Sequence, residues 1–187
     1  LRHEGGSEYV LDYLKKCLFK DEPYQITPSD VWVDKSLGGD VPEVMKNAGW
    51  FPIQEGEAEG TIVGGNLCTL NLLQGTPYLP SLKGSILFLE DDGESRPEIF
   101  NRDLQSLLQT KAFSGVRGVV IGRFERVSGM SDEKLLQILH TKRELASLPI
   151  IAGVDFGHTG PLITFPVGGT ARISVQADRA SIQILKH

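Results

Sequence analysis

The sequence predicts an α/β fold with a parallel βαβαβ body and an antiparallel C-terminal part. Between residues 85 and 156, continuous apolar runs of strand length alternate with amphipathic helical patterns, which is typical of a parallel sheet covered on both faces. Beyond residue 160, short apolar runs are separated by turn residues, as in antiparallel sheets. The 187 residues are 40% hydrophobic and 23% charged, which is the composition of about one globular domain.

The first third of the chain is expected to be less regular. An apolar stripe predicts a helix over 7–19, for which Ser7 is a suitable N-cap. Residues 20–56 are rich in proline and are expected to form loops with a short strand or two. A short β-rich run over 61–63 precedes a helix predicted over 66–74. That helix is apolar nearly all round and should therefore be buried.

The body of the domain is predicted from alternating strands and helices. Ser95 and Pro97 signal the start of one helix, and Ser131 followed by acidic residues signals the start of another. Strands are expected over 85–89, 118–122 and 149–156, and shorter ones over 162–165, 171–175 and 181–185.

Composition and charge exclude several classes of partner. The 19 basic and 24 acidic residues give a net charge of −5, whereas nucleic-acid binding needs a basic surface, so no nucleic acid is expected. No stretch of 18 apolar residues predicts a membrane span. Cys17 and Cys68 are expected to be free, buried thiols. No cofactor motif is found, and since Leu1 is not Met and no signal peptide follows, we expect the chain to begin inside a longer protein.

Ionisable groups follow two of the buried strands. One strand ends in Glu90, Asp91 and Asp92, and another ends in Asp155 and His158. If both strands run parallel, Glu90 and His158 leave the sheet at the same edge. A carboxylate beside a histidine fixes the imidazole tautomer and stabilises its cation, which is the orienting half of a nucleophile–His–acid triad. A solvated acidic loop beside a structural histidine is the alternative, and a metal site built from these groups has no ligand spacing to support it.

The nucleophile that such a pair needs is not evident. No G-x-S-x-G elbow occurs, Ser85 opens a buried strand, and Ser95 and Ser131 resemble helix caps. The sequence therefore holds a candidate base and its orienting acid without a nucleophile.

Three ordered segments resemble the C-terminal domain of LD-carboxypeptidases, a family that includes muramoyltetrapeptide carboxypeptidases and microcin C self-immunity peptidases. The first segment is EGEAEGTIVGGNL over 55–67, followed by LLQGT over 72–76. The others are LFLED over 87–91 and DFGHTGP over 155–161. The resemblance covers roughly residues 7–187, and the Gly-Gly-Asn-Leu segment is closer to the microcin-immunity branch.

The resemblance implies a three-layer swivelling β/β/α domain over 21–187. It is preceded by a boundary helix over 1–20, which is a remnant of, or a linker from, an N-terminal domain absent from this sequence. The resemblance also implies a serine peptidase with a Ser-Glu-His triad, in which Glu90 and His158 match the family's Glu and His while the Ser lies in the N-terminal domain. The family removes a C-terminal residue across an L,D bond in cytoplasmic muropeptides, or cleaves an amide bond in a peptidyl-nucleotide. Members are commonly homodimers and need no metal or other cofactor.

Two further expectations concern activity and substrate. A triad acts as a unit, so this chain alone is expected to be inactive. A non-catalytic binding or dimerisation domain and a metal-dependent hydrolase are the alternatives.

Gly64, Gly65 and Asn66 are expected to line the substrate-binding site, although Asn66 also suits a helix N-cap. Trp32 is a candidate for stacking on an aromatic ligand, although it also suits simple packing.

Overall fold

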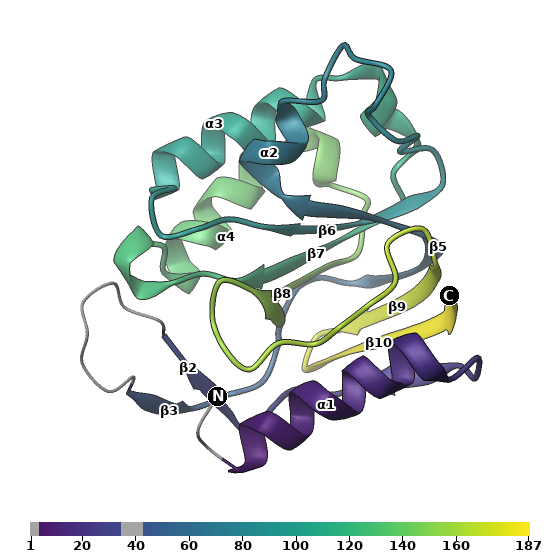
Figure 1. The fold of residues 1–187 in the computed structure, drawn as a ribbon. Helices are drawn as coiled ribbons and strands as arrows, with labels where there is room; N and C mark the ends of the chain where they lie inside the picture. The colour runs from purple at the N-terminus through teal and green to yellow at the C-terminus, as the bar shows by residue number, and fades with distance from the viewer. Residues whose placement is uncertain (1–3, 35–42) are drawn as a thin grey trace.

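The computed structural model describes residues 4–34 and 43–187, so that residues 1–3 of the expected boundary segment lie outside the described part (Figure 1). The helices are α1 (Glu4–Phe19), α2 (Leu67–Asn71), α3 (Pro97–Leu108) and α4 (Asp132–His140), with 3₁₀ turns at Lys111–Gly115, Arg126–Ser128 and Arg143–Leu145. The strands are β1 (Tyr24–Ile26), β2 (Val31–Val33), β3 (Val44–Lys46), β4 (Phe51–Gln54), β5 (Gly56–Asn66), β6 (Ser85–Glu90), β7 (Gly118–Arg123), β8 (Ile150–Gly157), β9 (Thr170–Gln176) and β10 (Arg179–Lys186).

One mixed sheet of eight strands organises the described residues, in the order β1-β10-β9-β5-β6-β7-β8-β4. Strands β5 to β8 are parallel neighbours, and β9, β10 and β1 continue the sheet in antiparallel fashion beyond β5. Strand β4 adds to β8 antiparallel, while β2 and β3 form a separate ribbon. The predicted parallel body and antiparallel C-terminal part are both confirmed.

The sheet folds over itself and so creates the predicted β/β/α layers. The 11-residue strand β5 pairs through its first half with β9 and through its second half with β6. Because β4 at one end of the sheet contacts β9 and β10, the antiparallel part lies against the parallel part. Helices α3 and α4 cover the outer face of β6 and β7, and α1 lies beneath β9 and β10 (Figure 1).

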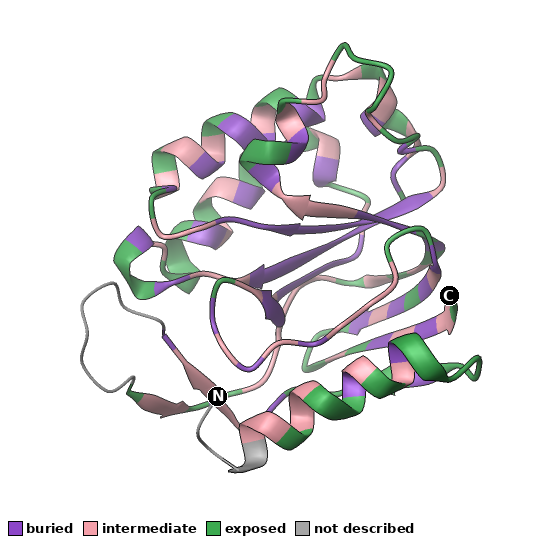
Figure 2. Cartoon of the chain, viewed as in Figure 1, coloured by how far each residue is buried: buried purple, intermediate pink, exposed green. Residues whose placement is uncertain are grey.

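Alternation along the strands divides the interior into two cores. Leu87 and Leu89 of β6 face the helices, whereas Ile86 and Phe88 face the layer between the two parts of the sheet. All of β6 is buried, as are most residues of β7 and β8 (Figure 2). The same alternation places Glu90, the last residue of β6, on the Phe88 side.

Two expectations about strands were wrong. Residues 162–165 do not form a strand: Pro161 and Pro166 flank them and cannot donate to a ladder, although the Ile163 amide does reach the Asp155 carbonyl (2.8 Å). Residues 20–56 contain more than a strand or two, namely β1 to β4. Those strands were missed because β1 and β4 are stabilised by partners more than 90 residues away in sequence, β10 and β8.

The helix predicted over 66–74 is also shorter and more exposed than expected. Helix α2 ends at Asn71 and packs on α3 through one face, so that Leu67 and Leu70 are buried while Leu72 is 74% exposed. Cys68 is exposed, contrary to the expectation of a buried thiol, whereas Cys17 is buried as expected.

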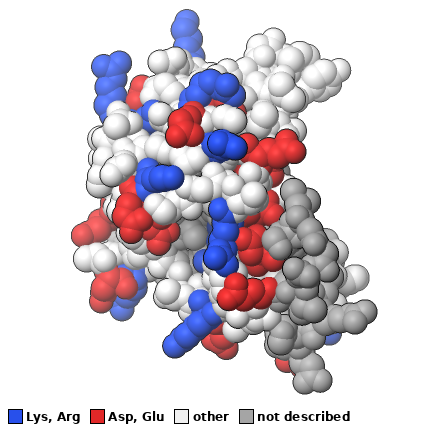
Figure 3. Space-filling view, turned by 90° about the vertical axis from the view of Figure 1, so that its left-hand side faces the viewer, with Lys and Arg blue, Asp and Glu red and all other residues white. Residues whose placement is uncertain are grey.

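One face of the molecule shows how the charged side chains are distributed. Acidic and basic side chains are interspersed on the face shown in Figure 3 rather than gathered by sign. Within residues 4–34 and 43–187, no helix is long and apolar enough to cross a bilayer.

Candidate active site

The ends of β6 and β8 bring Glu90 and His158 together. His158 follows β8 directly, and its Nδ1 donates to Oε2 of Glu90 at 2.7 Å. The two strands are separated by β7, so the contact depends on the parallel register that the topology creates. With Nδ1 bound to the carboxylate, Nε2 is the ring nitrogen left to accept a proton.

The two members of this pair differ in exposure. The Glu90 side chain is only 10% exposed, whereas the His158 side chain is 45% exposed. Burial raises the pKa of Glu90, and the hydrogen bond from His158 acts in the opposite direction. The arrangement is therefore a buried carboxylate that holds an accessible imidazole in one orientation.

The neighbouring Asp91 points to the other face of the sheet, as alternation requires. It accepts hydrogen bonds from Ser95 Oγ at 2.6 Å, from Asn66 Nδ2 at 3.2 Å and from the Asp92 amide at 3.1 Å. Burial raises the pKa of Asp91 as well. Ser95 is thus engaged with Asp91 and is not the cap of α3, contrary to expectation, whereas Ser131 does cap α4 through the amide of Lys134.

Asp155 forms a second buried centre on β8, and sequence reasoning missed its role. It is 1% exposed and pairs with Arg123, the last residue of β7. Its donors are Tyr9 Oη (3.3 Å), the Ser29 amide (3.2 Å), Asn47 Nδ2 (3.1 Å), Trp50 Nε1 (3.1 Å) and Arg123 (3.2 Å). The available signal was Arg123, a charged residue at the end of a buried strand. Asp155 therefore attaches α1 and the segments around β2 to β4 to β8, the strand that His158 follows.

The residues expected to bind substrate lie around the same edge of the sheet. Asn66 is the partner of Glu90 in the β5–β6 register, and it also caps α2 by accepting from the Thr69 amide at 3.0 Å. A Cβ on Gly64 would overlap the Phe88 carbonyl oxygen, so this glycine is required by strand packing. At Gly65 the backbone φ is +141° and the space beside it is open.

Trp32 reaches this region from the β2–β3 ribbon. Residue Val33 forms a two-way backbone bridge with Gly160, two residues beyond His158, with N···O distances of 2.6 and 2.9 Å. The Trp32 ring is half-buried beneath the Arg123 guanidinium, whose centre lies 5.1 Å from the ring centroid. Trp32 is therefore linked to the His158 loop through Val33 and to Asp155 through Arg123.

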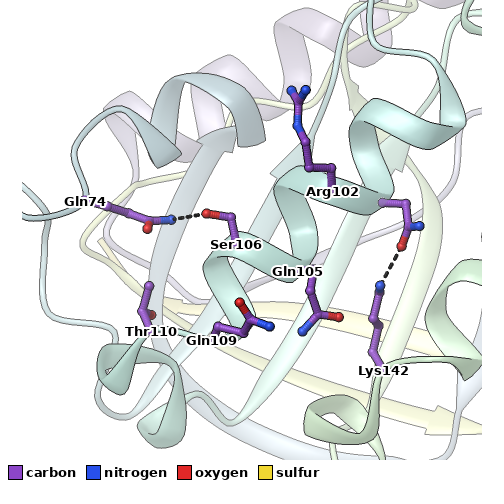
Figure 4. Close-up of a pocket in the computed structure, with 8 residues that line it drawn as sticks. Gln74, Arg102, Gln105, Ser106, Gln109, Thr110 and Lys142 are labelled. Carbon is purple, nitrogen blue, oxygen red and sulfur yellow. Dashed lines mark hydrogen bonds between the residues drawn. The ribbon is translucent and has the colours of Figure 1, made fainter.

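A separate polar groove of about 700 Å³ runs along α3, on the helical layer (Figure 4). Its lining residues are Gln74, Asn101, Arg102, Gln105, Ser106, Gln109, Thr110 and Lys142. Several of them bond one another, as Lys142 Nζ does with Asn101 Oδ1 at 2.5 Å. The groove does not include Glu90 or His158.

Metal ligands and a nucleophile are not assembled in the described part of the chain. In residues 4–34 and 43–187, no group of three or more His, Cys, Asp or Glu side chains is placed to hold a metal ion. Within the same ranges, no hydroxyl or thiol forms a hydrogen bond with His158.

The fold and the sequence place this domain in a known family. Residues 59–173 match the model of the LD-carboxypeptidase C-terminal domain, and the chain belongs to that family. It is 46% identical over 184 residues to the putative carboxypeptidase YocD of Bacillus subtilis, covering 97% of this chain and 57% of the relative.

Solved structures share the fold. An MccF-like protein from Bacillus anthracis superposes with a TM-score of 0.93 at 43% identity, covering 99% of this chain and 57% of that one. An MccF-like protein from Streptococcus pneumoniae, solved in complex with AMP, has a TM-score of 0.76 at 25% identity, with 94% and 57% covered. The chain thus spans little more than half the length of these relatives.

Proposed function

We propose that this chain supplies the acid and the base of a Ser-Glu-His triad in a serine-type carboxypeptidase. The observation that carries the proposal is the 2.7 Å hydrogen bond from an exposed His158 to a buried Glu90. In this role Nε2 of His158 takes the proton of the attacking serine and later delivers it to the leaving amine. Glu90 keeps the imidazole in the Nδ1–H tautomer and stabilises the cation that forms.

We propose that the serine comes from a preceding domain of the intact protein. The relatives are longer than this chain, which covers 57% of YocD. Among the described residues, no hydroxyl or thiol is hydrogen-bonded to His158. Residues 1–20 then connect the preceding domain to the catalytic half over 21–187. This chain alone is inactive under the proposal, and the intact protein is a cytoplasmic homodimer that needs neither metal nor other cofactor.

The proposed substrate is an L,D-peptide bond in a muropeptide or an amide bond in a peptidyl-nucleotide. Relatives of both kinds match: a probable murein peptide carboxypeptidase of Bacillus subtilis and the microcin C7 self-immunity protein of Escherichia coli. Solved relatives include complexes with AMP and with aspartyl sulfamoyl adenosine. Gly64, Gly65 and Asn66 would line the substrate, and Trp32 would stack on its aromatic portion.

The test is hydrolysis by the intact protein of an L,D-tetrapeptide and of an aminoacyl sulfamoyl adenosine. His158→Ala is expected to lower kcat by about 10³-fold or more, because triad members act together. His140→Ala, which changes a histidine at the end of α4, is the matched control and should leave kcat unchanged. Undiminished turnover by His158→Ala would refute the proposal. Binding without turnover of either substrate would favour a non-catalytic domain.

A further inference from the structure

The contact between Glu90 and His158 has to span a strand. Their strands, β6 and β8, both pair with β7, and neighbouring strands lie about 4.8 Å apart, so the two backbones are about 10 Å apart. Leu89 is the register partner of Ile121, which places Gly122 of β7 beside Glu90. The Glu90 side chain therefore reaches His158 across the position of Gly122.

Gly122 leaves no room for a side chain at this crossing. A Cβ there would lie 2.9 Å from the Glu90 Cβ and 2.6 Å from the Phe156 carbonyl oxygen. The backbone at Gly122 is not in the left-handed region, so the conformation itself does not require glycine. What excludes a methyl group at Gly122 is the passage of the Glu90 side chain together with the backbone of β8.

Gly157, the last residue of β8, also lies against the Glu90 side chain. A Cβ there would lie 2.9 Å from Glu90 Oε2, the atom that accepts from His158, and 3.1 Å from the Glu90 Cβ. Its φ of +108° is one that residues with side chains rarely adopt. Both the conformation and the nearby carboxylate therefore call for glycine at position 157.

We propose that Gly122 and Gly157 are positioning residues that form a slot for the Glu90 side chain and hold its carboxylate against His158 Nδ1. The slot is defined by the distances at Gly122 and Gly157, whereas its effect on catalysis depends on the proposed function. A methyl group at position 122 would push the carboxylate off the imidazole. A displacement of about 1 Å at a catalytic group costs about 10²-fold in rate, which is the loss expected in kcat.

The competing explanation is that these glycines serve only the packing of the sheet. Gly118, at the start of the same strand β7, provides the control. A Cβ on Gly118 would lie 2.7 Å from Ile173 Cδ1, the movable end of a side chain, so Gly118→Ala crowds β7 more mildly than Gly122→Ala and at the end away from Glu90. A purely structural role predicts that both substitutions lower stability and leave the His158 tautomer unchanged, whereas a positioning role predicts that Gly122→Ala alone changes the tautomer.

The experiment compares Gly122→Ala and Gly118→Ala in the intact protein by ¹⁵N NMR of the histidine ring and by steady-state kinetics. In wild type and Gly118→Ala, the ring shifts of His158 should report the Nδ1–H tautomer. In Gly122→Ala they should report loss of that tautomer preference, with kcat lowered about 10²-fold and KM little changed. In a Glu90→Ala background, Gly122→Ala should have no further effect on kcat.

Three results would overturn the inference. The first is an Nδ1–H tautomer and a kcat in Gly122→Ala that equal those of Gly118→Ala. The second is an equal further loss of kcat in the Glu90→Ala background. The third is failure of both Gly122→Ala and Gly157→Ala to fold while Gly118→Ala folds, since the glycines would then serve folding alone. Because the tautomer is measured without substrate, an inactive wild type that shows the expected NMR changes would refute the proposed function and leave the slot supported.

Discussion

Replacing Asp155 by asparagine would test whether this carboxylate holds the N-terminal segments on the sheet. The substitution keeps the shape of the side chain and removes its charge. Both carboxylate oxygens are used: Oδ1 accepts from Asn47 and Arg123, and Oδ2 accepts from Tyr9, Ser29 and Trp50. Whichever position the new amide nitrogen takes, it faces at least two donors.

The size of the effect follows from the burial of the pair. Asp155 is 1% exposed and the Arg123 side chain 15%, so the substitution leaves a largely buried cation without its counter-ion. Breaking a buried ion pair from one side costs about 3–5 kcal/mol. Arg123 keeps the Gly153 carbonyl and Asn47 Oδ1 as acceptors at 2.9 Å, which favours the lower end of that range. We expect a loss of about 3 kcal/mol in the free energy of unfolding.

The measurement is equilibrium urea unfolding followed by tryptophan fluorescence and by circular dichroism. Glu59→Gln is the control, because it removes an ion pair with Arg172 whose side chains are 49% and 56% exposed. Such exposed pairs contribute at most about 1 kcal/mol. A loss for Asp155→Asn no larger than the control's, with the same dependence on urea, would refute the reasoning.

Three further predictions concern the Glu90 carboxyl, the two cysteines and Gly64. The substitution His158→Phe keeps the Glu90 carboxylate covered but removes its hydrogen-bond donor, so the pKa of Glu90 should rise further. The pKa is measured by ¹³C NMR of the carboxyl group, and an unchanged or lower value would contradict the 2.7 Å contact. Cys68 should react with a thiol reagent in the native protein and Cys17 only on unfolding, because burial protects Cys17 and raises its pKa. Gly64→Ala should cost about 3 kcal/mol in urea unfolding, since its Cβ meets the backbone of β6; a neutral effect would show that the strands can separate.

The parallel body could be predicted because each of its elements carries its own local pattern. The residues of β6 are apolar without interruption, and Pro97 and Ser131 mark helix starts, as the structure confirms. The strands before residue 56 carry no such pattern. Strand β4, for example, contains Pro52 and exists because it pairs with β8, about 100 residues later. Pairing of this kind depends on the whole fold and leaves little trace in the local sequence.

The candidate pair was predictable for a different reason. Strand ends in a parallel sheet collect at one edge, so a Glu after one strand and a His after another were expected to meet. Strand ends alone left Glu90, Asp91 and Asp92 as neighbouring acids, and the family resemblance singled out Glu90 as the partner of the histidine. Alternation decides this once the bounds of β6 are known, because Glu90 shares the Phe88 face and Asp91 does not. The ring of donors around Asp155 was missed because its members are scattered between residues 9 and 123.

Asp155 lies on β8 and His158 follows the same strand directly, which connects stability with the candidate site. The N-terminal segments donate hydrogen bonds to Asp155. Arg123 forms an ion pair with Asp155, and its guanidinium also packs over the Trp32 ring. The β2–β3 ribbon is then fixed a second time, by the backbone bridge between Val33 and Gly160. A Trp32 ring held from two sides keeps one orientation, and in its proposed role of stacking on substrate this would lower the entropic cost of binding. Weakening the Asp155 centre should therefore loosen Trp32 while the hydrogen bond between Glu90 and His158, in which Asp155 takes no part, remains.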